Sequence, residues 1–147
     1  LLRIHALLSL LAPAAYYSSL PLFCLALITH VNLSLKHGHT ADSAFGYVSY
    51  GFLLLAVFQQ FELGHDFGRL GIILNDRFQN TQLTCQLNVV FATGLHYNRP
   101  LREALELSVK GYRAGLETGD MNYSAYGCYN AVLVRFALGE ELGAVLG

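Results

Sequence analysis

Two histidines and one aspartate lie near one another in the segment His37-Gly38-His39 and at Asp42, and these residue types can bind a transition metal. Two histidines that stand two positions apart at the end of a helix do not share a helical face. No further pair of metal-binding side chains lies nearby in the sequence. We therefore predict a turn followed by a helix start at this segment, and no metal site in the chain.

The adjacent residues His65 and Asp66 could form a histidine oriented by a carboxylate, which is the arrangement of many general bases. Neighbouring residues on a helix point apart, so we interpret these two as ordinary helix residues. The motifs of serine hydrolases, phosphate-binding loops, dinucleotide-binding folds and zinc metalloproteases are absent from the sequence. We predict no catalytic residue and no cofactor, and we keep a small all-α enzyme with a His/Asp site as an alternative.

The three cysteines, Cys24, Cys85 and Cys128, each stand in an apolar stretch of the sequence. Their wide separation argues against a zinc site built from paired cysteines. A cysteine in an apolar stretch is usually a small buried hydrophobic residue, and reduced thiols are typical of the cytoplasm. The cysteines therefore predict buried, reduced thiols in a cytoplasmic protein.

The composition of the chain limits the elements that could position these residues. Of the 147 residues, 54% are hydrophobic and 13% are charged, so the chain can bury a large core. The net charge is −1 and the basic residues are scattered, which argues against the basic surface of a nucleic-acid-binding protein. We therefore expect a folded protein that binds no nucleic acid.

Long stretches without formal charge raise a second alternative, a membrane-embedded helical segment of a sensor protein. The longest stretch lies between Arg3 and Lys36, and it is interrupted by Pro13 and Pro21. The other stretches contain several Gln and Asn residues, whose polar side chains find no partners in lipid. We therefore favour the buried helices of a soluble protein, and we predict no membrane partner.

The fold predicted from the sequence is all-α. Apolar residues recur at helical spacing between glycines and prolines, and no stretch shows the alternation of a strand. We predict that Pro13 helps to end the first helix, that Thr40 and Asp120 cap later helices, and that Gly38 and Gly119 follow the ends of two others. The predicted helices cover Leu2–Ala14, Pro21–His37, Thr40–Gln59, Glu62–Phe78, Thr81–His96, Leu101–Glu117 and Met121–Leu138, and an eighth begins at Gly139.

One segment of the sequence occurs twice, as LKHGHTADSAFGY from Leu35 to Tyr47 and as LETGDMNYSAYGC from Leu116 to Cys128. The two copies share a leucine, a glycine and the pattern Ser-Ala-aromatic-Gly, and we call the sequence distance from Leu35 to Leu116 the long interval. Self-similarity at a fixed spacing indicates a stack of antiparallel helix pairs. We predict irregular tetratricopeptide-like repeats with a period of about 40 residues, half of the long interval. The predicted units cover residues 1–38, 39–79, 80–119 and a truncated 120–147.

Small residues at the repeated positions would let neighbouring helices approach closely. A single-core helical bundle in which the similarity arises by chance remains the alternative to the repeat array. Three tyrosines on apolar helix faces, Tyr47, Tyr112 and Tyr126, are predicted to lie in the core with a polar tip. The predicted repeat and packing residues are Gly38, Ala44, Gly46, Gly119, Ala125 and Gly127.

Four segments carry a family resemblance: VNLSLKHG at Val31–Gly38, SAFGYVSYG at Ser43–Gly51, YRAGLETGD at Tyr112–Asp120 and SAYGCYNAVLVRFALGEEL at Ser124–Leu142. In the same order, they resemble the tetratricopeptide-like helical region of large multi-sensor signalling kinases of cyanobacteria and other bacteria. One departure is Tyr97, where relatives commonly carry a tryptophan.

In these kinases the usual order is a serine/threonine kinase domain, a STAND-type ATPase, the helical region, a GAF sensor and a histidine kinase or cyclase. The resemblance implies a cytoplasmic, non-catalytic module for signal transduction that links the ATPase to the sensor and output domains. Its partners would be these neighbouring domains or another protein. None of the family's catalytic residues maps to this chain. The chain begins Leu-Leu rather than with methionine, so we expect a segment of a longer protein.

Overall fold

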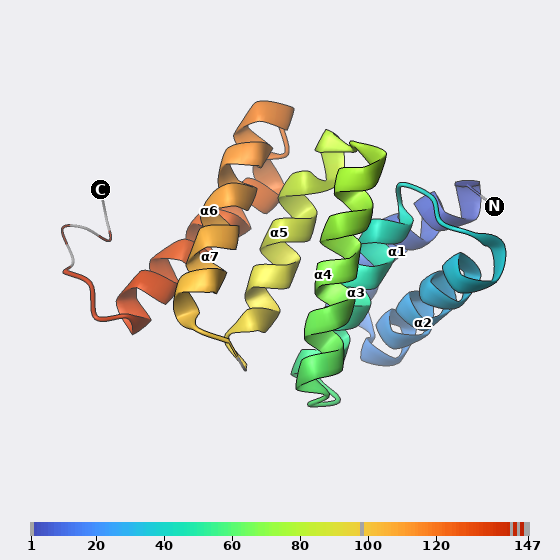
Figure 1. Cartoon of the computed structure of the whole chain (residues 1–147), viewed down its shortest axis with the longest axis horizontal. Coiled ribbons are helices and arrows are strands. Elements are labelled where there is room, and N and C mark those ends of the chain that lie inside the picture. Colours follow the sequence, from blue (N-terminus) through green and yellow to red (C-terminus); the bar gives the residue numbers. More distant parts are fainter. Residues whose placement is uncertain (1, 98, 142, 144, 146–147) are drawn as a thin grey trace. The chain divides into compact units, whose positions relative to one another are not determined.

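The computed structural model describes residues 2–97, 99–141, 143 and 145, and this part of the chain contains helices and connections but no strand. The prediction of an all-α fold is confirmed. The helices shown in Figure 1 are α1 (Leu2–Ser18), α2 (Leu20–His37), α3 (Ser43–Ala56), α4 (Phe61–Phe78), α5 (Thr81–Leu95), α6 (Leu101–Thr118) and α7 (Met121–Ala137).

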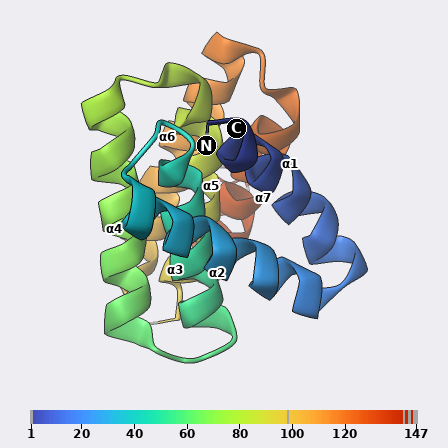
Figure 2. The same ribbon diagram turned by 90° about the vertical axis from the view of Figure 1, so that its right-hand side faces the viewer.

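The chain divides into two compact units, Leu1–Asn80 with α1 to α4 and Thr81–Gly147 with α5 to α7. In the first unit, α4 returns alongside α3, and α3 also packs against α2 (Figure 2). Helix α3 is apolar on nearly all sides, and its side chains Tyr47, Val48, Leu53 and Leu55 are completely buried. Burying one such leucine stabilises the fold by about 1.5–3 kcal/mol, so α3 forms the centre of this unit.

In the second unit, α6 packs against both α5 and α7. The buried side of α6 consists of the small residues Ala104, Ser108, Gly111 and Gly115, which recur every three or four positions. The charged residues of α6 lie on its exposed side, so the helix is strongly amphipathic. The small residues allow the backbones of α5 and α7 to approach α6 closely.

Helix α1 continues to Ser18, so the prediction that it ends at Ala14 with the help of Pro13 is wrong. A proline inside a helix removes one backbone hydrogen bond and costs about 3 kcal/mol. Ala12 and Ala15, on either side of Pro13, are almost completely buried. The second half of α1 contacts α2, where the rings of Tyr16 and Phe23 lie 5.3 Å apart, and such contacts favour a helix that continues past the proline.

Helix α3 begins at Ser43 and ends at Ala56, so it is shorter than predicted at both ends. Thr40 is not the N-cap, because the Thr40–Ser43 segment forms a turn in which the Ser43 amide donates to the Thr40 carbonyl at 3.0 Å. The Ser43 hydroxyl in turn accepts the Thr40 amide at 2.9 Å. The C-terminal end is fixed by Gln59, whose φ of 54° is incompatible with a continuing right-handed helix.

The other predicted helix ends fall at or near the observed ones. Asp120 caps α7 as predicted, because its carboxylate accepts the Tyr123 amide at 3.1 Å. Gly38 and Gly119 directly follow α2 and α6 with φ values of 93° and 80°. Gly139, with a φ of 75°, follows the end of α7. The predicted eighth helix does not begin at Gly139, because residues 139–141 are not helical, whereas Gly143 and Val145 are; residues 142, 144, 146 and 147 lie outside the described residues.

Candidate functional site

The residues with predicted chemical potential are not arranged as an active site. On α4, His65 Nδ1 lies 3.9 Å from Asp66 Oδ1, which is too far for a hydrogen bond, and the Asp66 side chain is 76% exposed. His39 instead pairs with Tyr47, whose hydroxyl lies 2.9 Å from His39 Nε2. Within the described residues, no group of three His, Cys, Asp or Glu side chains could hold a metal ion.

Several residues predicted to be buried lie on the surface. Of the three cysteines, Cys85 is buried, Cys24 is half-buried and Cys128 is exposed, and Tyr112 and Tyr126 are 36% and 42% exposed. The prediction of core positions is therefore wrong for Cys128, Tyr112 and Tyr126, whereas Tyr47 is completely buried as predicted. Helical periodicity identifies an apolar face, but it does not show whether another helix covers that face.

A pair of buried histidines, which the sequence analysis did not identify, joins α1 to α2. The rings of His5 and His30 are completely buried, with centroids 4.8 Å apart. No hydrogen-bond partner lies within reach of any of their four ring nitrogens in the described structure. Burial lowers the pKa of His30 to about 4, with a smaller contribution from the positive charge of His5, and burial also lowers the pKa of His5. Single histidines in apolar helices carry no sequence signal for such pairing.

Gly46 of α3 lies directly against this histidine pair. A Cβ atom added at Gly46 would lie 2.8 Å from His30 Cγ, closer than any normal contact. One turn away, the hydroxyl groups of Ser34 and Ser43 form a buried hydrogen bond of 2.9 Å between α2 and α3. A side chain at Gly46 would therefore separate α2 from α3.

Helices α6 and α7 of the second unit also meet at small residues. A Cβ atom at Gly127 of α7 would lie 3.0 Å from the Ser108 carbonyl oxygen and 3.1 Å from the Tyr112 nitrogen, both in α6. A Cβ atom at Gly115 would collide with the Ser124 hydroxyl. Ser124 follows Ser43 by the long interval, and Gly115 follows Ser34 by the same interval.

A second type of close contact joins α3 to α4 and α5 to α6. A Cβ atom at Gly71 of α4 would lie 2.5 Å from Val48 Cγ2 and 2.7 Å from the Ala44 carbonyl oxygen. A Cβ atom at Gly111 of α6 would lie 2.7 Å from Val89 Cγ2 and 3.2 Å from the Cys85 carbonyl oxygen. In both pairs a valine packs over a glycine of the following helix.

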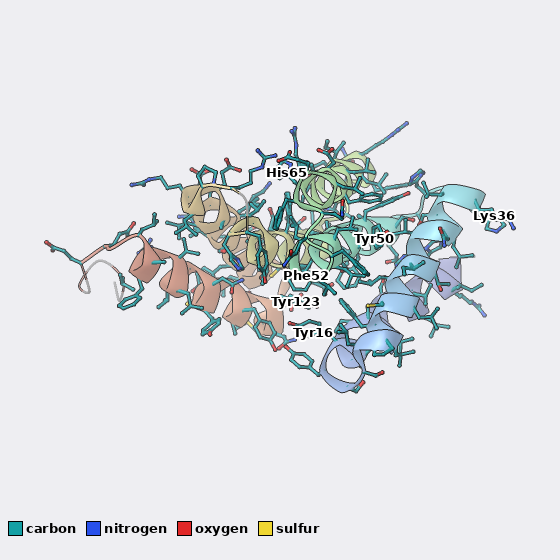
Figure 3. The ribbon with its side chains drawn as sticks, turned by 90° about the horizontal axis from the view of Figure 1, so that it is seen from below. Tyr16, Lys36, Tyr50, Phe52, His65 and Tyr123 are labelled. Atoms are coloured by element: carbon teal, nitrogen blue, oxygen red, sulfur yellow. The ribbon has the colours of Figure 1, made fainter. Side chains whose placement is uncertain are left out.

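The surface of the first unit carries many apolar side chains. The rings of Tyr16 in α1 and Phe52 in α3 lie 6.2 Å apart in an edge-on arrangement, while Lys36 lies near the end of α2 (Figure 3).

Helix α2 is long and apolar enough to cross a membrane, and one third of its residues are buried. A core helix of a soluble protein or a signal sequence would meet the same criterion.

Comparison with known proteins adds no relative: no family, no curated protein and no solved structure matches this chain. The features of the molecule that bear on function are the close helix contacts and the exposed apolar side chains.

Proposed function

We propose that this chain is a non-catalytic, tetratricopeptide-like helical repeat module that binds other protein domains. The observation that carries the proposal is the recurrence of the valine-over-glycine contact in α3–α4 and α5–α6. The sequence distance from Val48 to Val89 is one position longer than the distance from Gly71 to Gly111. Each of these two distances equals half of the long interval, rounded to a whole number of positions. A period of about 40 residues is compatible with one helix pair per repeat.

The helix boundaries support the same repeat. Helix α6 (Leu101–Thr118) begins and ends one long interval after α2 (Leu20–His37), and α7 ends one long interval after α3. The hydrogen bonds that end α3 and α7 also correspond, from the Val57 amide to the Leu53 carbonyl at 3.0 Å and from the Leu138 amide to the Val134 carbonyl at 2.9 Å. In this proposal, two helix pairs make up each long interval.

The proposed context is the cytoplasmic linker region of a bacterial multi-sensor signalling kinase, between its ATPase and its sensor and output domains. This context is supported by the four segments that resemble the helical region of such kinases. Helical repeat arrays bind their partners through extended surfaces made by successive repeats. The partners proposed here are the neighbouring domains of the same kinase or another protein.

The experiment has a sequence part and a binding part. The reading frame around the chain should encode an ATPase with a phosphate-binding loop upstream and a sensor or histidine kinase domain downstream. The purified chain should bind at least one of these domains in calorimetric titration, and it should show only background ATP hydrolysis and autophosphorylation. Activity that disappears in His65→Ala or Asp66→Ala would instead favour the small enzyme.

A second candidate function, insertion of the α1–α2 pair into a membrane, is favoured by one observation. Several large apolar side chains of these helices are more than 60% exposed: Leu7, Leu10, Tyr17, Leu25 and Leu35. Expression without detergent distinguishes the candidates. Soluble protein with a helical circular dichroism spectrum would support the repeat module, and recovery only from detergent-extracted membranes would support membrane insertion.

A further inference from the structure

Helix α7 carries an exposed apolar stripe, here called the α7 stripe, that consists of Ala125, Tyr129, Val132 and Phe136. The four residues follow one another at helical spacing, so they share one face. Tyr129 is 60% exposed and Phe136 is 69% exposed. A continuous stripe of this kind on a helix is typical of a face that receives another helix.

The corresponding stripes of α3 and α5 are buried. One long interval before the α7 stripe stand Ala44, Val48, Gly51 and Leu55 of α3, and all four are buried in the first unit, where α4 packs on them. Half an interval before the α7 stripe stand Cys85, Val89 and Ala92 of α5, which are buried in the second unit, where α6 packs on Cys85 and Val89. In both earlier cases, the covering helix is the next helix of the same chain.

The segment after α7 begins to form a helix as the segment after α3 does. The Val145 amide donates to the Glu141 carbonyl at 3.1 Å, and one long interval earlier the Gly64 amide donates to the Gln60 carbonyl at 2.8 Å. Val145 is buried. In this register, the position that corresponds to Gly71 and would cover Ala125 and Tyr129 is the fifth residue after Gly147.

We propose that the α7 stripe is the docking face for the next helix of the array, supplied in cis by polypeptide that continues the turn at Leu138–Glu141. This inference rests on the proposed repeat module. The helix would carry a small residue opposite Tyr129, as α6 carries Gly111 opposite Val89. Helix α4 is a poorer model than α6 for this docked helix. The α4 backbone approaches Gly51 of α3 closely, and α7 carries the larger Val132 at the corresponding position, which would prevent such an approach.

The test extends the full chain in register. In one protein, residues 1–147 are followed directly by a copy of Leu107–Gly119, which places a glycine at the fifth added position. The matched control carries the same extension with that added glycine changed to leucine. The unextended chain is the third protein. A second variant of the extended chain carries Tyr129→Glu, which places a charge in the α7 stripe at an exposed position.

The readout is the alkylation rate of Cys128, measured by mass spectrometry. Cys128 is exposed beside the α7 stripe, whereas its counterpart Tyr47, one long interval earlier, is buried and stacks on Phe67 of α4 with ring centroids 5.9 Å apart. The extension should slow alkylation of Cys128 about tenfold. This factor follows if the added helix has an effective concentration of about 1 mM at the α7 stripe and binds it with a dissociation constant of about 0.1 mM. The leucine control and the Tyr129→Glu variant should react nearly as fast as the unextended chain.

Cys85, which is buried beneath α6, provides an internal reference in every protein. If Cys128 reacts equally fast with and without the extension while Cys85 stays protected, the docking inference is wrong and the repeat packing stands. Equal protection by the leucine control would also overturn the inference, because the contact would lack the required shape. Concentration-dependent protection in an unextended dimer would identify a second copy as the occupant and overturn docking in cis. If Cys85 reacts as fast as Cys128 in the unextended chain, the α5–α6 contact is open and the proposed function itself fails.

Discussion

At the scale of single residues, the buried histidine pair gives the first unit a stability that depends on pH. The pKa of His30 is about 4 in the folded chain and 6.5 when the ring is in water. Above pH 6.5, His30 is neutral in both the folded and the unfolded chain, so its burial does not lower the free energy of unfolding. As pH falls below 6.5, the unfolded chain takes up a proton that the folded chain excludes, and stability decreases until about pH 4.

We expect the free energy of unfolding to fall by about 2 kcal/mol between pH 7 and pH 5. The full difference in the pKa of His30 between the unfolded and the folded chain corresponds to about 3 kcal/mol. Urea titrations followed by circular dichroism at the two pH values measure this difference. In His30→Leu the dependence should be much weaker, because the ring that excludes the proton is gone. An equal decrease in the wild-type chain and His30→Leu would show that other groups cause it.

The glycines at the helix contacts provide a second test at the residue scale. Gly46→Leu and Gly127→Leu should each destabilise the fold by about 1–3 kcal/mol or more, because the added side chains meet His30 and the α6 backbone. Gly143 is a matched control, since a Cβ atom there meets nothing within 4 Å. Gly143→Ala should leave the thermal midpoint unchanged or raise it slightly. Unchanged midpoints in both leucine variants would contradict the packing role.

At the scale of elements, α4 and α6 are each followed by a residue in the left-handed conformation, but the two residues differ in type. Gln79 has a φ of 51° after α4, and Gly119, half an interval later, has a φ of 80° after α6. The left-handed region costs a residue with a side chain about 1–2 kcal/mol, and glycine avoids this cost. Gln79→Gly should therefore raise the free energy of unfolding, and Gly119→Gln should lower it, by about 1 kcal/mol each. Shifts of the same sign in thermal melts of the two variants would refute this account.

The sequence predicted the helices well, because glycines and apolar spacing mark helix ends and faces locally. It did not predict which faces are covered, because coverage depends on neighbouring helices. Tyr126 and Cys128 illustrate this, since their counterparts Phe45 and Tyr47 are buried and they are exposed. The continuation of α1 through Pro13 has the same origin, because it depends on contacts with α2 that a local signal does not show. The histidine pair was not predictable, since it joins residues from two helices.

At the scale of the whole molecule, the exposed apolar side chains predict self-association. In the proposed repeat array, terminal faces without polar residues would expose the surfaces that neighbouring repeats cover. We expect oligomers in sedimentation velocity experiments at micromolar concentration. Replacing two of the most exposed side chains, as in Leu10→Lys and Phe136→Lys, should reduce the oligomers without lowering the helix content. A clean monomer of the unmodified chain would contradict this prediction.

The helix contacts within each unit join only helices that are adjacent or next but one along the chain. Such local contacts close short loops, and helical proteins with low contact order fold within microseconds to milliseconds. A ribosome that adds about 5–20 residues per second needs roughly 4–16 s to synthesise Leu1–Asn80. The first unit therefore has time to fold as it emerges from the ribosome, while the second unit is still being synthesised. Its apolar helices would be packed against one another before they could meet those of another nascent chain.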